Sequence, residues 1–304
     1  MNKEPKIVIV SPIRDEEDYL EKTINSLVNQ TLLPVEWVIV DDGSKDRTPE
    51  IIANAAAKYS WIRVIPKEDR GERAVGPGVV EAFYYGYNRI QSSDYDYICK
   101  MDGDIEFKPD YFKTLLSYFE RDSHLGAASG KPYVYEDGKL VEERHSDEMV
   151  AGMINFYKRE CFENIGGFVR EVHWDGITFH RARMFGWRTR SLRHEDLEFI
   201  HLRKMGTSYK GIVTGRMRWG RGQYFMGTSL FYVCAISLYR SFEKPYIVGG
   251  FWIFMGYLKA LFSPMKRYDD KAFRASLHAW QRERLKIGKR IENIPEPEVS
   301  GLYS

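Results

Sequence analysis

Short apolar runs alternate with amphipathic segments near the start of the chain, and this alternation most constrains its fold. Residues 7–10, 35–40 and 61–65 are apolar and rich in β-branched side chains, whereas 19–30 and 48–56 carry apolar residues at helical spacing. Continuous apolar runs of this length are typical of strands buried on both faces. Strands that alternate with helices over short connections form right-handed units of a parallel sheet. We therefore expect an α/β fold with a mostly parallel central sheet flanked by helices.

Two carboxylates follow the expected end of another strand. The apolar part of residues 95–107 stops at Asp102-Gly103-Asp104, and a helical segment follows at 109–121. Parallel α/β sheets bind ligands just beyond the carboxyl ends of their strands. Neighbouring carboxylates suit a hard divalent cation. An ordinary turn is the alternative interpretation, since Asp and Gly are both common in turns.

The loop after the first strand lacks the usual phosphate-binding patterns. Residues 11–16 read Ser-Pro-Ile-Arg-Asp-Glu, with neither the Gly-x-Gly-x-x-Gly of dinucleotide-binding proteins nor a Walker sequence. If this fold binds a diphosphate, a cation must therefore balance its charge. The pair Asp102 and Asp104 is the obvious holder of that cation.

Three motifs stand in a fixed order along the chain. Pro12-Ile13-Arg14-Asp15-Glu16 follows the first strand, Asp41-Asp42-Gly43-Ser44 follows the second, and the Asp-Gly-Asp motif comes about 60 residues later. In this combination the chain resembles the family 2 glycosyltransferases of the GT-A fold, over roughly residues 5–215. The resemblance implies a nucleoside-diphosphate sugar donor, with a UDP-sugar favoured and a GDP-sugar as the alternative, and Mn²⁺ or Mg²⁺ as cofactor.

The resemblance also assigns residues to the donor and to the metal. Arg14 stands where the family often has a tyrosine that stacks on the base, and a planar guanidinium can stack as well. Asp41 is expected to hydrogen-bond the base. His201 resembles a histidine that adds a nitrogen ligand to the metal, which suits manganese; a structural histidine is the alternative. The nucleotide-binding residues implied are Pro12, Arg14, Glu16, Asp41 and Asp102, and the metal ligands are Asp102, Asp104 and His201.

Arginines in two other segments are candidates for phosphate contacts. Arg73 lies in the basic, glycine-rich loop 67–78, where it can meet a phosphate or a base, or belong to a solvated connection. Arg216, Arg218 and Arg221 lie among aromatic residues and can face a phosphate of donor or acceptor.

A second cluster begins at His173-Trp174-Asp175-Gly176, ahead of a helix that ends at Gly186. The family usually has a Glu-Asp pair at this distance before a Gly-aromatic pair, which places Trp174 on the Glu and Asp175 on the Asp. The resemblance thus implies that Asp175 is the general base that takes the acceptor hydroxyl's proton. A carboxylate in this place is stabilised by the helix N-terminus, and a plain helix cap is the alternative.

The last third of the chain changes in character. Apolar, aromatic runs at 225–239 and 246–262 are joined by a charged turn, and residues 264–291 hold nine basic and three acidic side chains. We expect a glycosyltransferase domain at 1–220 and a helical region at 221–304 that lies on an anionic membrane surface. A helical hairpin packed on the core, or a contact in a homo-oligomer, is the alternative.

Composition narrows the cellular setting. No apolar stretch reaches the about 18 residues of a membrane span, and the N-terminus does not read as a signal peptide. The three cysteines lie far apart, without zinc or disulfide spacing, and are expected to be buried thiols. A net charge of +2 does not favour nucleic acid. We expect a cytoplasmic protein, peripheral at the inner face of the membrane.

These observations predict a metal-dependent, inverting glycosyltransferase with a saccharide or polyprenyl-linked acceptor in polysaccharide or glycolipid assembly. A sugar nucleotidyltransferase is one alternative, although it would need a glycine-rich phosphate loop after the first strand. A non-catalytic nucleotide-sugar or membrane-binding module is another, because Trp174 replaces the usual Glu. A glycosidase needs a facing carboxylate pair and no nucleotide site, which disfavours it.

Overall fold

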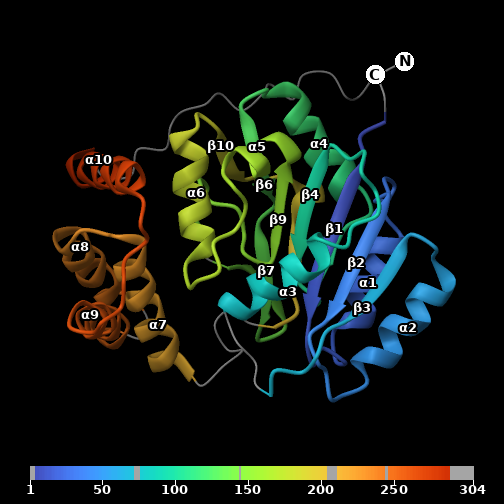
Figure 1. The fold of residues 1–304 in the computed structure, drawn as a ribbon, viewed down its shortest axis with the longest axis horizontal. Coiled ribbons are helices and arrows are strands. Elements are labelled where there is room, and N and C mark those ends of the chain that lie inside the picture. Colours follow the sequence, from blue (N-terminus) through green and yellow to red (C-terminus); the bar gives the residue numbers. More distant parts are fainter. Residues whose placement is uncertain (1–3, 72–75, 144, 204–210, 244–245, 288–304) are drawn as a thin grey trace.

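A seven-stranded sheet forms the centre of the chain. Figure 1 shows a computed structural model, which describes residues 4–71, 76–143, 145–203, 211–243 and 246–287. The strands of this sheet are β1 (Ile7–Ile13), β2 (Glu36–Asp41), β3 (Ile62–Pro66), β4 (Tyr97–Met101), β6 (Leu125–Ser129), β9 (Ile154–Lys158) and β10 (Arg188–Ser191). Their order is β10-β6-β9-β4-β1-β2-β3, and only the pairs made by β9 are antiparallel. The expected α/β fold with a mostly parallel sheet is confirmed.

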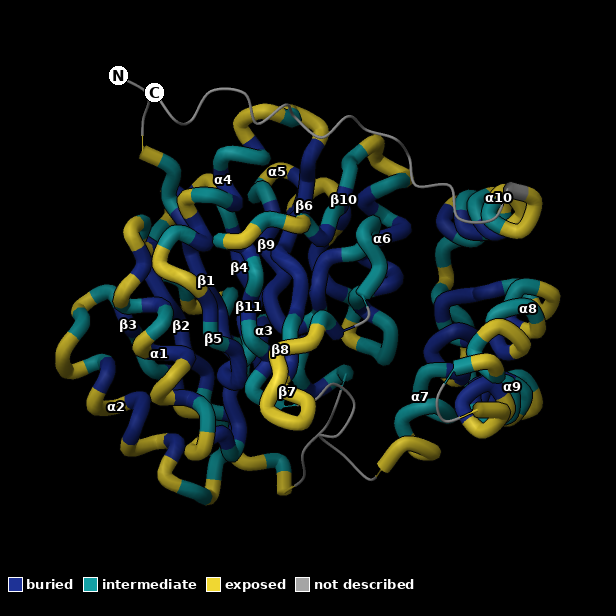
Figure 2. Tube along the Cα trace, turned by 180° about the vertical axis from the view of Figure 1, so that it is seen from behind, coloured by how far each residue is buried: buried dark blue, intermediate teal, exposed yellow. Residues whose placement is uncertain are grey.

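Helices bury both faces of this sheet. They are α1 (Leu20–Val28), α2 (Thr48–Lys58), α3 (Pro77–Tyr87), α4 (Tyr111–Arg121), α5 (Arg159–Asn164) and α6 (Trp174–Met184). Successive side chains of β1 enter opposite cores: Ile7 and Ile9 pack with α1, α2 and α4, whereas Val8 and Val10 pack with α3, α5 and α6. Burial on both faces explains why β1 is continuously apolar, and Figure 2 shows the central strands in dark blue.

A smaller sheet brings distant residues together beside the end of β4. It contains β5 (Ile105–Phe107), β7 (Pro132–Glu136), β8 (Lys139–Glu142) and β11 (Phe199–His201), in the order β5-β11-β7-β8. A hairpin joins β7 to β8, with positive φ angles at Asp137 and Gly138 in its turn. In the antiparallel pair of β11 with β5, His201 lies opposite Ile105. This register places His201 next to Asp104.

The C-terminal helices pack closely on one another. A short 3-10 helix at Glu195–Leu197 precedes β11, and the later helices are α7 (Gly211–Met226), α8 (Leu230–Ser241), α9 (Val248–Leu261) and α10 (Lys271–Ile287). A Cβ on Gly220 would lie 1.9 Å from the carbonyl oxygen of Ile253, and one on Gly256 would lie 2.2 Å from that of Met217. Glycine therefore lets α7 and α9 approach backbone to backbone. Helix α7 runs across residue 220, where we expected the boundary between the two regions.

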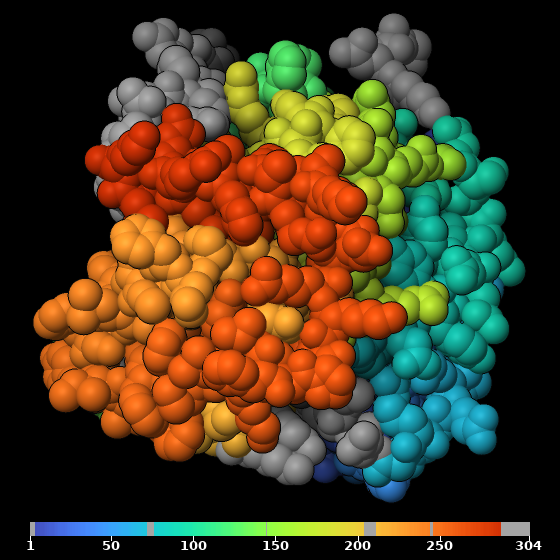
Figure 3. Space-filling view, turned by 60° about the vertical axis from the view of Figure 1, so that its left-hand side comes forward, coloured from blue at the N-terminus to red at the C-terminus, as the bar shows by residue number. Residues whose placement is uncertain are grey.

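Helices α8 and α9 correspond to the two apolar runs seen in the sequence, and Figure 3 shows α8, α9 and α10 on one face of the molecule. Among the described residues, none of the helices combines the length and the apolar character of a membrane span.

Cys99 and Cys161 are buried, as expected, whereas the prediction that Cys234 is buried was wrong. Cys234 lies on the outer side of α8, between the exposed Phe231 and Leu238.

Candidate active site

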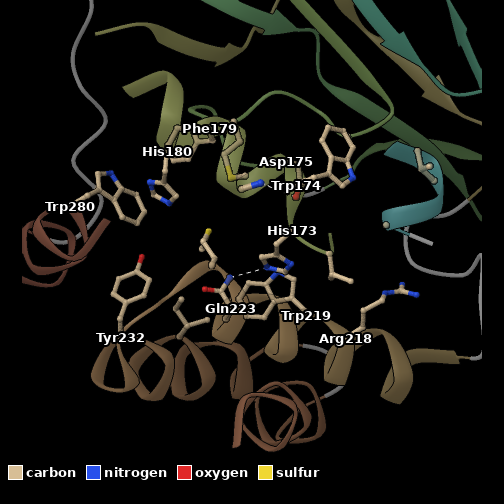
Figure 4. A pocket seen from close by; sticks show the side chains of 18 of the residues that line it. His173, Trp174, Asp175, Phe179, His180, Arg218, Trp219, Gln223, Tyr232 and Trp280 are labelled. Atoms are coloured by element: carbon tan, nitrogen blue, oxygen red, sulfur yellow. Dashed lines mark hydrogen bonds between the residues drawn. The ribbon is translucent and has the colours of Figure 1, made fainter. Parts of the chain in front are cut away.

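A pocket of about 440 Å³ lies between the edge of the large sheet and the C-terminal helices. Its lining includes Asp102, which follows β4. It also includes Asp175, which lies in the first turn of α6 (Figure 4). The opposite wall comes from α7, α8 and α10. Of the candidate site residues named from the sequence, these two aspartates and Arg218 line the pocket. Pro12, Arg14, Glu16, Asp41, Asp104 and His201 lie outside its lining.

Lys100 is the buried partner of Asp102. Its side chain is 3% exposed, and its ammonium forms an ion pair with the Asp102 carboxylate and donates to the carbonyl oxygen of Gly152 at 2.9 Å. Burial raises the pKa of Asp102, and the Lys100 charge offsets only part of that rise. The sequence reasoning missed Lys100. A lysine inside the apolar run of β4 was a usable signal, because a buried charge needs a partner.

Asp104 and His201 face each other beside this pair. The Asp104 Oδ2 atom lies 3.7 Å from His201 Nε2 and 3.8 Å from Arg203 Nε, and Glu143 Oε2 lies 2.9 Å from His201 Nδ1. Burial alone would lower the pKa of His201, but Asp104 and Glu143 outweigh it and raise that pKa to about 9. His201 and Arg203 likewise lower the pKa of Asp104 against the effect of burial.

Glu143 was not identified from the sequence, because it is one of several charged residues in the stretch 142–148 and no local pattern distinguishes it. Its side chain is buried and orients the His201 ring. Glu16 belongs to the same network: its carboxylate pairs with Arg203, and its backbone N–H donates to Thr48 Oγ1 at 2.8 Å. Glu16 therefore connects the loop after β1 to the surroundings of Asp104.

Arg14 is held by the loops that follow β2 and β3. Its Nη1 donates to the carbonyl oxygen of Asp42 at 2.8 Å, its Nη2 lies 2.7 Å from Asp69 Oδ1, and its buried Nε has no hydrogen-bond partner among the described residues. The hydrogen bond from the Gly71 N–H lowers the pKa of the Asp69 carboxyl most, and the Arg14 guanidinium adds to this effect. Together they bring that pKa to about 2. The sequence reasoning missed Asp69, which fixes the guanidinium that we expected at the base.

The ends of β1 and β2 lie side by side, since Pro12 pairs with Val40 and Ile13 with Asp41. The Asp41 carboxylate accepts from the Ser44 N–H at 2.9 Å and so shapes its own turn. Asp42, next in the chain, is buried and forms ion pairs with Lys67 and Arg70.

Of the other arginine candidates, Arg73 lies outside the described residues. Arg218 lines the pocket, and burial lowers its pKa. Arg221 instead lies 3.6 Å from Glu171. Among the described residues that line the pocket, Lys100 and Arg218 are the lysine and the arginine.

Asp175 sits in the first turn of α6 and is not its cap. The helix begins at Trp174, its N-cap residue is His173, and Asp175 Oδ1 accepts from the adjacent Gly176 N–H at 2.8 Å. His173 has a φ of 68°, and its Nε2 lies 3.0 Å from the Gln223 amide nitrogen on α7. Trp174 packs edge-on against Phe168, with ring centroids 4.7 Å apart. These contacts fix the start of α6 although the usual glutamate is absent.

The carboxylate oxygens and imidazole nitrogens at Asp104 and His201 are of the kinds that bind divalent cations. Within the described part of the chain, no three His, Cys, Asp or Glu side chains converge as a complete ion-binding cluster. A nucleotide-bound ion needs only one or two protein carboxylates, because the phosphates supply further ligands. Glu143 behind His201 is the carboxylate–histidine arrangement that orients metal-binding imidazoles. The residues present therefore fit such an ion.

Comparison with known proteins agrees with this architecture. The model of the family "Glycosyl transferase family 2" matches residues 8–195. A poly-β-1,6-N-acetyl-D-glucosamine synthase of Staphylococcus aureus is 24% identical in an alignment of 228 residues, and the match covers 68% of this chain and 52% of the relative. The chain thus spans about half the length of the curated relatives it matches.

Two solved structures show the same fold. The mannosyltransferase PcManGT of Pyrobaculum calidifontis, solved with GDP-Man and Mn²⁺, is 17% identical, with a TM-score of 0.55 over 93% of this chain and 81% of that one. TarS 1-349 of S. aureus, solved with UDP-GlcNAc, is 16% identical, with a TM-score of 0.52 over 85% of this chain and 73% of that one. At these identities the likeness establishes the fold.

Proposed function

Because the chain belongs to glycosyl transferase family 2, we propose that it transfers a sugar from a nucleoside-diphosphate sugar to a hydroxyl group of an acceptor. One observation carries this proposal: Asp102, at the carboxyl end of β4, and Asp175, at the start of α6, line the same pocket. Ligand sites of open α/β sheets lie at this edge. A donor on one side of the pocket and an acceptor on the other would meet between these carboxylates.

The donor-binding role of the sheet edge rests on its charges. Lys100 and Arg218 are cations of the pocket lining and suit an anionic diphosphate. Pro12, Arg14 and Asp41 lie at the adjoining ends of β1 and β2, where the nucleoside would extend. GDP-Man and UDP-GlcNAc, bound to the two structural relatives, represent the two donor classes.

Asp104 and His201 would hold Mn²⁺ or Mg²⁺, with Asp102 beside them. When bound, the ion supplies charge stabilisation to the departing diphosphate. Glu143 orients the His201 ring, and Arg203 joins Glu16 to Asp104. This network would keep the donor side of the pocket fixed during the reaction.

Asp175 would act as the general base. As the acceptor oxygen forms its bond to the anomeric carbon, the bond from that carbon to the diphosphate breaks, and the hydroxyl proton passes to the Asp175 carboxylate. Attack from the face opposite the leaving group inverts the anomeric configuration. The contacts of His173 and Trp174 would orient the carboxylate for this step.

A donor-binding and turnover experiment tests these roles. UDP-sugars and GDP-sugars are screened by thermal shift with and without Mn²⁺, and nucleotide release is then measured with the stabilising donor. We expect Asp175→Asn to bind the donor normally and to lose at least about a hundredfold of transfer, the usual size of a general-base contribution. Asp104→Ala should lose the Mn²⁺-dependent part of nucleotide binding.

Two controls make the outcome decisive. Asp137→Asn changes an aspartate in the β7–β8 turn, away from the pocket lining, and should keep both properties. Full transfer by Asp175→Asn would remove Asp175 as the base. Nucleotide affinity that is identical with and without Mn²⁺ in the unmodified protein would refute the metal site.

We also infer that the C-terminal helices rest on an anionic membrane surface, which would suit a polyprenyl-linked acceptor. Large apolar side chains are exposed along α8 and the turn after it, including Phe231 at 75%, Phe242 at 74% and Ile247 at 71%. Exposed basic residues follow on α10 and in the segment before it: Lys266, Lys271, Arg282 and Lys286. Apolar and basic side chains together are typical of helices at an anionic interface.

Vesicle sedimentation tests this inference. The full chain should sediment with vesicles of phosphatidylserine and phosphatidylcholine and much less with phosphatidylcholine alone. The double variant Phe231→Ser/Phe242→Ser should stay in the supernatant, whereas Tyr135→Ser, at an exposed tyrosine of β7, should bind normally. Equal binding by both variants would contradict the assignment of this face.

A further inference from the structure

The end of the pocket farther from β4 differs in chemistry from the end at Lys100 and Asp102. Phe179 and His180 on α6, Tyr232 and Ile236 on α8, and Trp280 on α10 line it. We call these five residues the aromatic chamber. Figure 4 shows His180 and Trp280 pointing toward one another, with Tyr232 facing them from α8 and Asp175 between this group and the opposite end at Arg218.

Ring contacts hold the aromatic chamber in shape. The His180 and Trp280 rings meet at 74° with centroids 4.8 Å apart, and the Tyr232 ring lies 5.9 Å from that of Trp280. Arg183 and Arg284 lie against the Trp280 ring, at 5.5 and 5.1 Å from its centroid. Arg284 also pairs with Glu148 at 2.8 Å and so ties α10 to the segment that precedes the pocket residue Met149.

One polar atom of the aromatic chamber is unsatisfied. His180 is 6% exposed, and its Nδ1 is buried without a hydrogen-bond partner among the described residues. Such atoms are rare in folded proteins and call for an explanation. Burial, together with Arg183 and Arg284, lowers the pKa of His180 to about 3, so the ring is neutral at ordinary pH. A neutral imidazole surrounded by aromatic rings suits a ligand that is mainly apolar and carries an oxygen or a hydroxyl.

We propose that the aromatic chamber is an acceptor subsite, and that it takes an apolar group attached to the sugar whose hydroxyl faces Asp175. This inference rests on the proposed function. The apolar group would lie against Trp280 and Tyr232, and an oxygen near the glycosidic bond would meet His180 Nδ1. The charged end of the pocket would remain for the donor. The chain is thereby assigned to acceptors with a hydrophobic aglycone, and free sugars would be poor acceptors.

Binding of simple glycosides to the full chain tests the subsite. Methyl, phenyl and octyl β-glucosides, β-N-acetylglucosaminides and α-mannosides are titrated by calorimetry in the presence of UDP and Mn²⁺. For at least one sugar, the phenyl and octyl glycosides should bind about tenfold more tightly than the methyl glycoside, because each buries an apolar group against the aromatic rings. Trp280→Ala should bring the ratio close to one. Ile236→Trp, which fills the chamber without removing a ring, should do the same.

The control variant is Phe262→Ala, because Phe262 is 84% exposed and lies outside the pocket lining; it should keep the full preference. UDP affinity is measured for every protein. Equal affinity for methyl and phenyl glycosides, no binding of any phenyl or octyl glycoside, or an unchanged preference in Ile236→Trp would overturn the subsite while UDP still binds. Absence of UDP and donor binding in the unmodified protein would instead overturn the proposed function.

Discussion

The buried His180 makes the stability of the chain depend on pH in a way that can be calculated. Its pKa is about 3 in the folded chain, against an ordinary value of 6.5. Between these values the unfolded chain holds a proton that the folded chain does not. The free energy of unfolding is therefore highest above pH 6.5, falls as the pH is lowered, and stops falling below about pH 3. At pH 5 the loss from this one residue is about 2 kcal/mol.

Urea titrations at pH 8 and pH 5 measure this loss in the native sequence and in His180→Phe. Phenylalanine keeps a ring against Phe179 and Trp280 but has no titrating group. Other groups titrate alike in both proteins, so the native chain should lose about 2 kcal/mol more than the variant between the two pH values. Equal losses would refute the reasoning, because they would mean that His180 protonates freely in the folded state.

Three further predictions concern packing and positioning. Gly220→Ala should lower the free energy of unfolding by more than about 2 kcal/mol, because its methyl group would overlap the Ile253 carbonyl. Gly215→Ala is the control, because it lies in the same helix with open space around it. Its free energy of unfolding should be unchanged or higher by up to about 1 kcal/mol. Gln223→Ala removes the amide that meets His173, and transfer should slow without loss of UDP affinity; unchanged turnover would exclude a positioning role. Lys100→Met leaves Asp102 without its buried partner. The free energy of unfolding, measured by denaturant titration, should fall by about 1–3 kcal/mol, and UDP should bind more weakly. Undiminished UDP affinity would contradict the placement of the diphosphate.

Local patterns in the sequence were enough to predict the first four strands of the main sheet. Continuous apolar runs marked β1, β2 and β4, and the rule that parallel strands end at one edge placed Asp41 and Asp102 at the same side of the molecule. The motif spacing also identified the family, which the family match confirms. These features depend on neighbours in the sequence, so a single chain reveals them.

Contacts between distant segments could not be predicted in the same way. The pairing of β11 with β5 brings His201 to Asp104, and Glu143, which follows β8 in the same small sheet, reaches His201 only once that sheet is assembled. Similarly, Asp69 reaches Arg14 because two separate loops meet. Nothing in the local composition of these segments specifies such encounters.

The pocket is divided between two separate stretches of the sequence. Its charged edge at Asp102 comes from the strand-containing part of the chain, whereas Tyr232 and Trp280 come from the helices that follow. Replacing α8 and α10 by related helices would exchange one wall and leave the order of strands, and the carboxylates at their ends, untouched. If this wall holds the acceptor as proposed, an exchange of α8 and α10 that keeps α7, with its Arg218 and Gln223, would alter the choice of recipient and leave the residues assigned to the nucleotide in place.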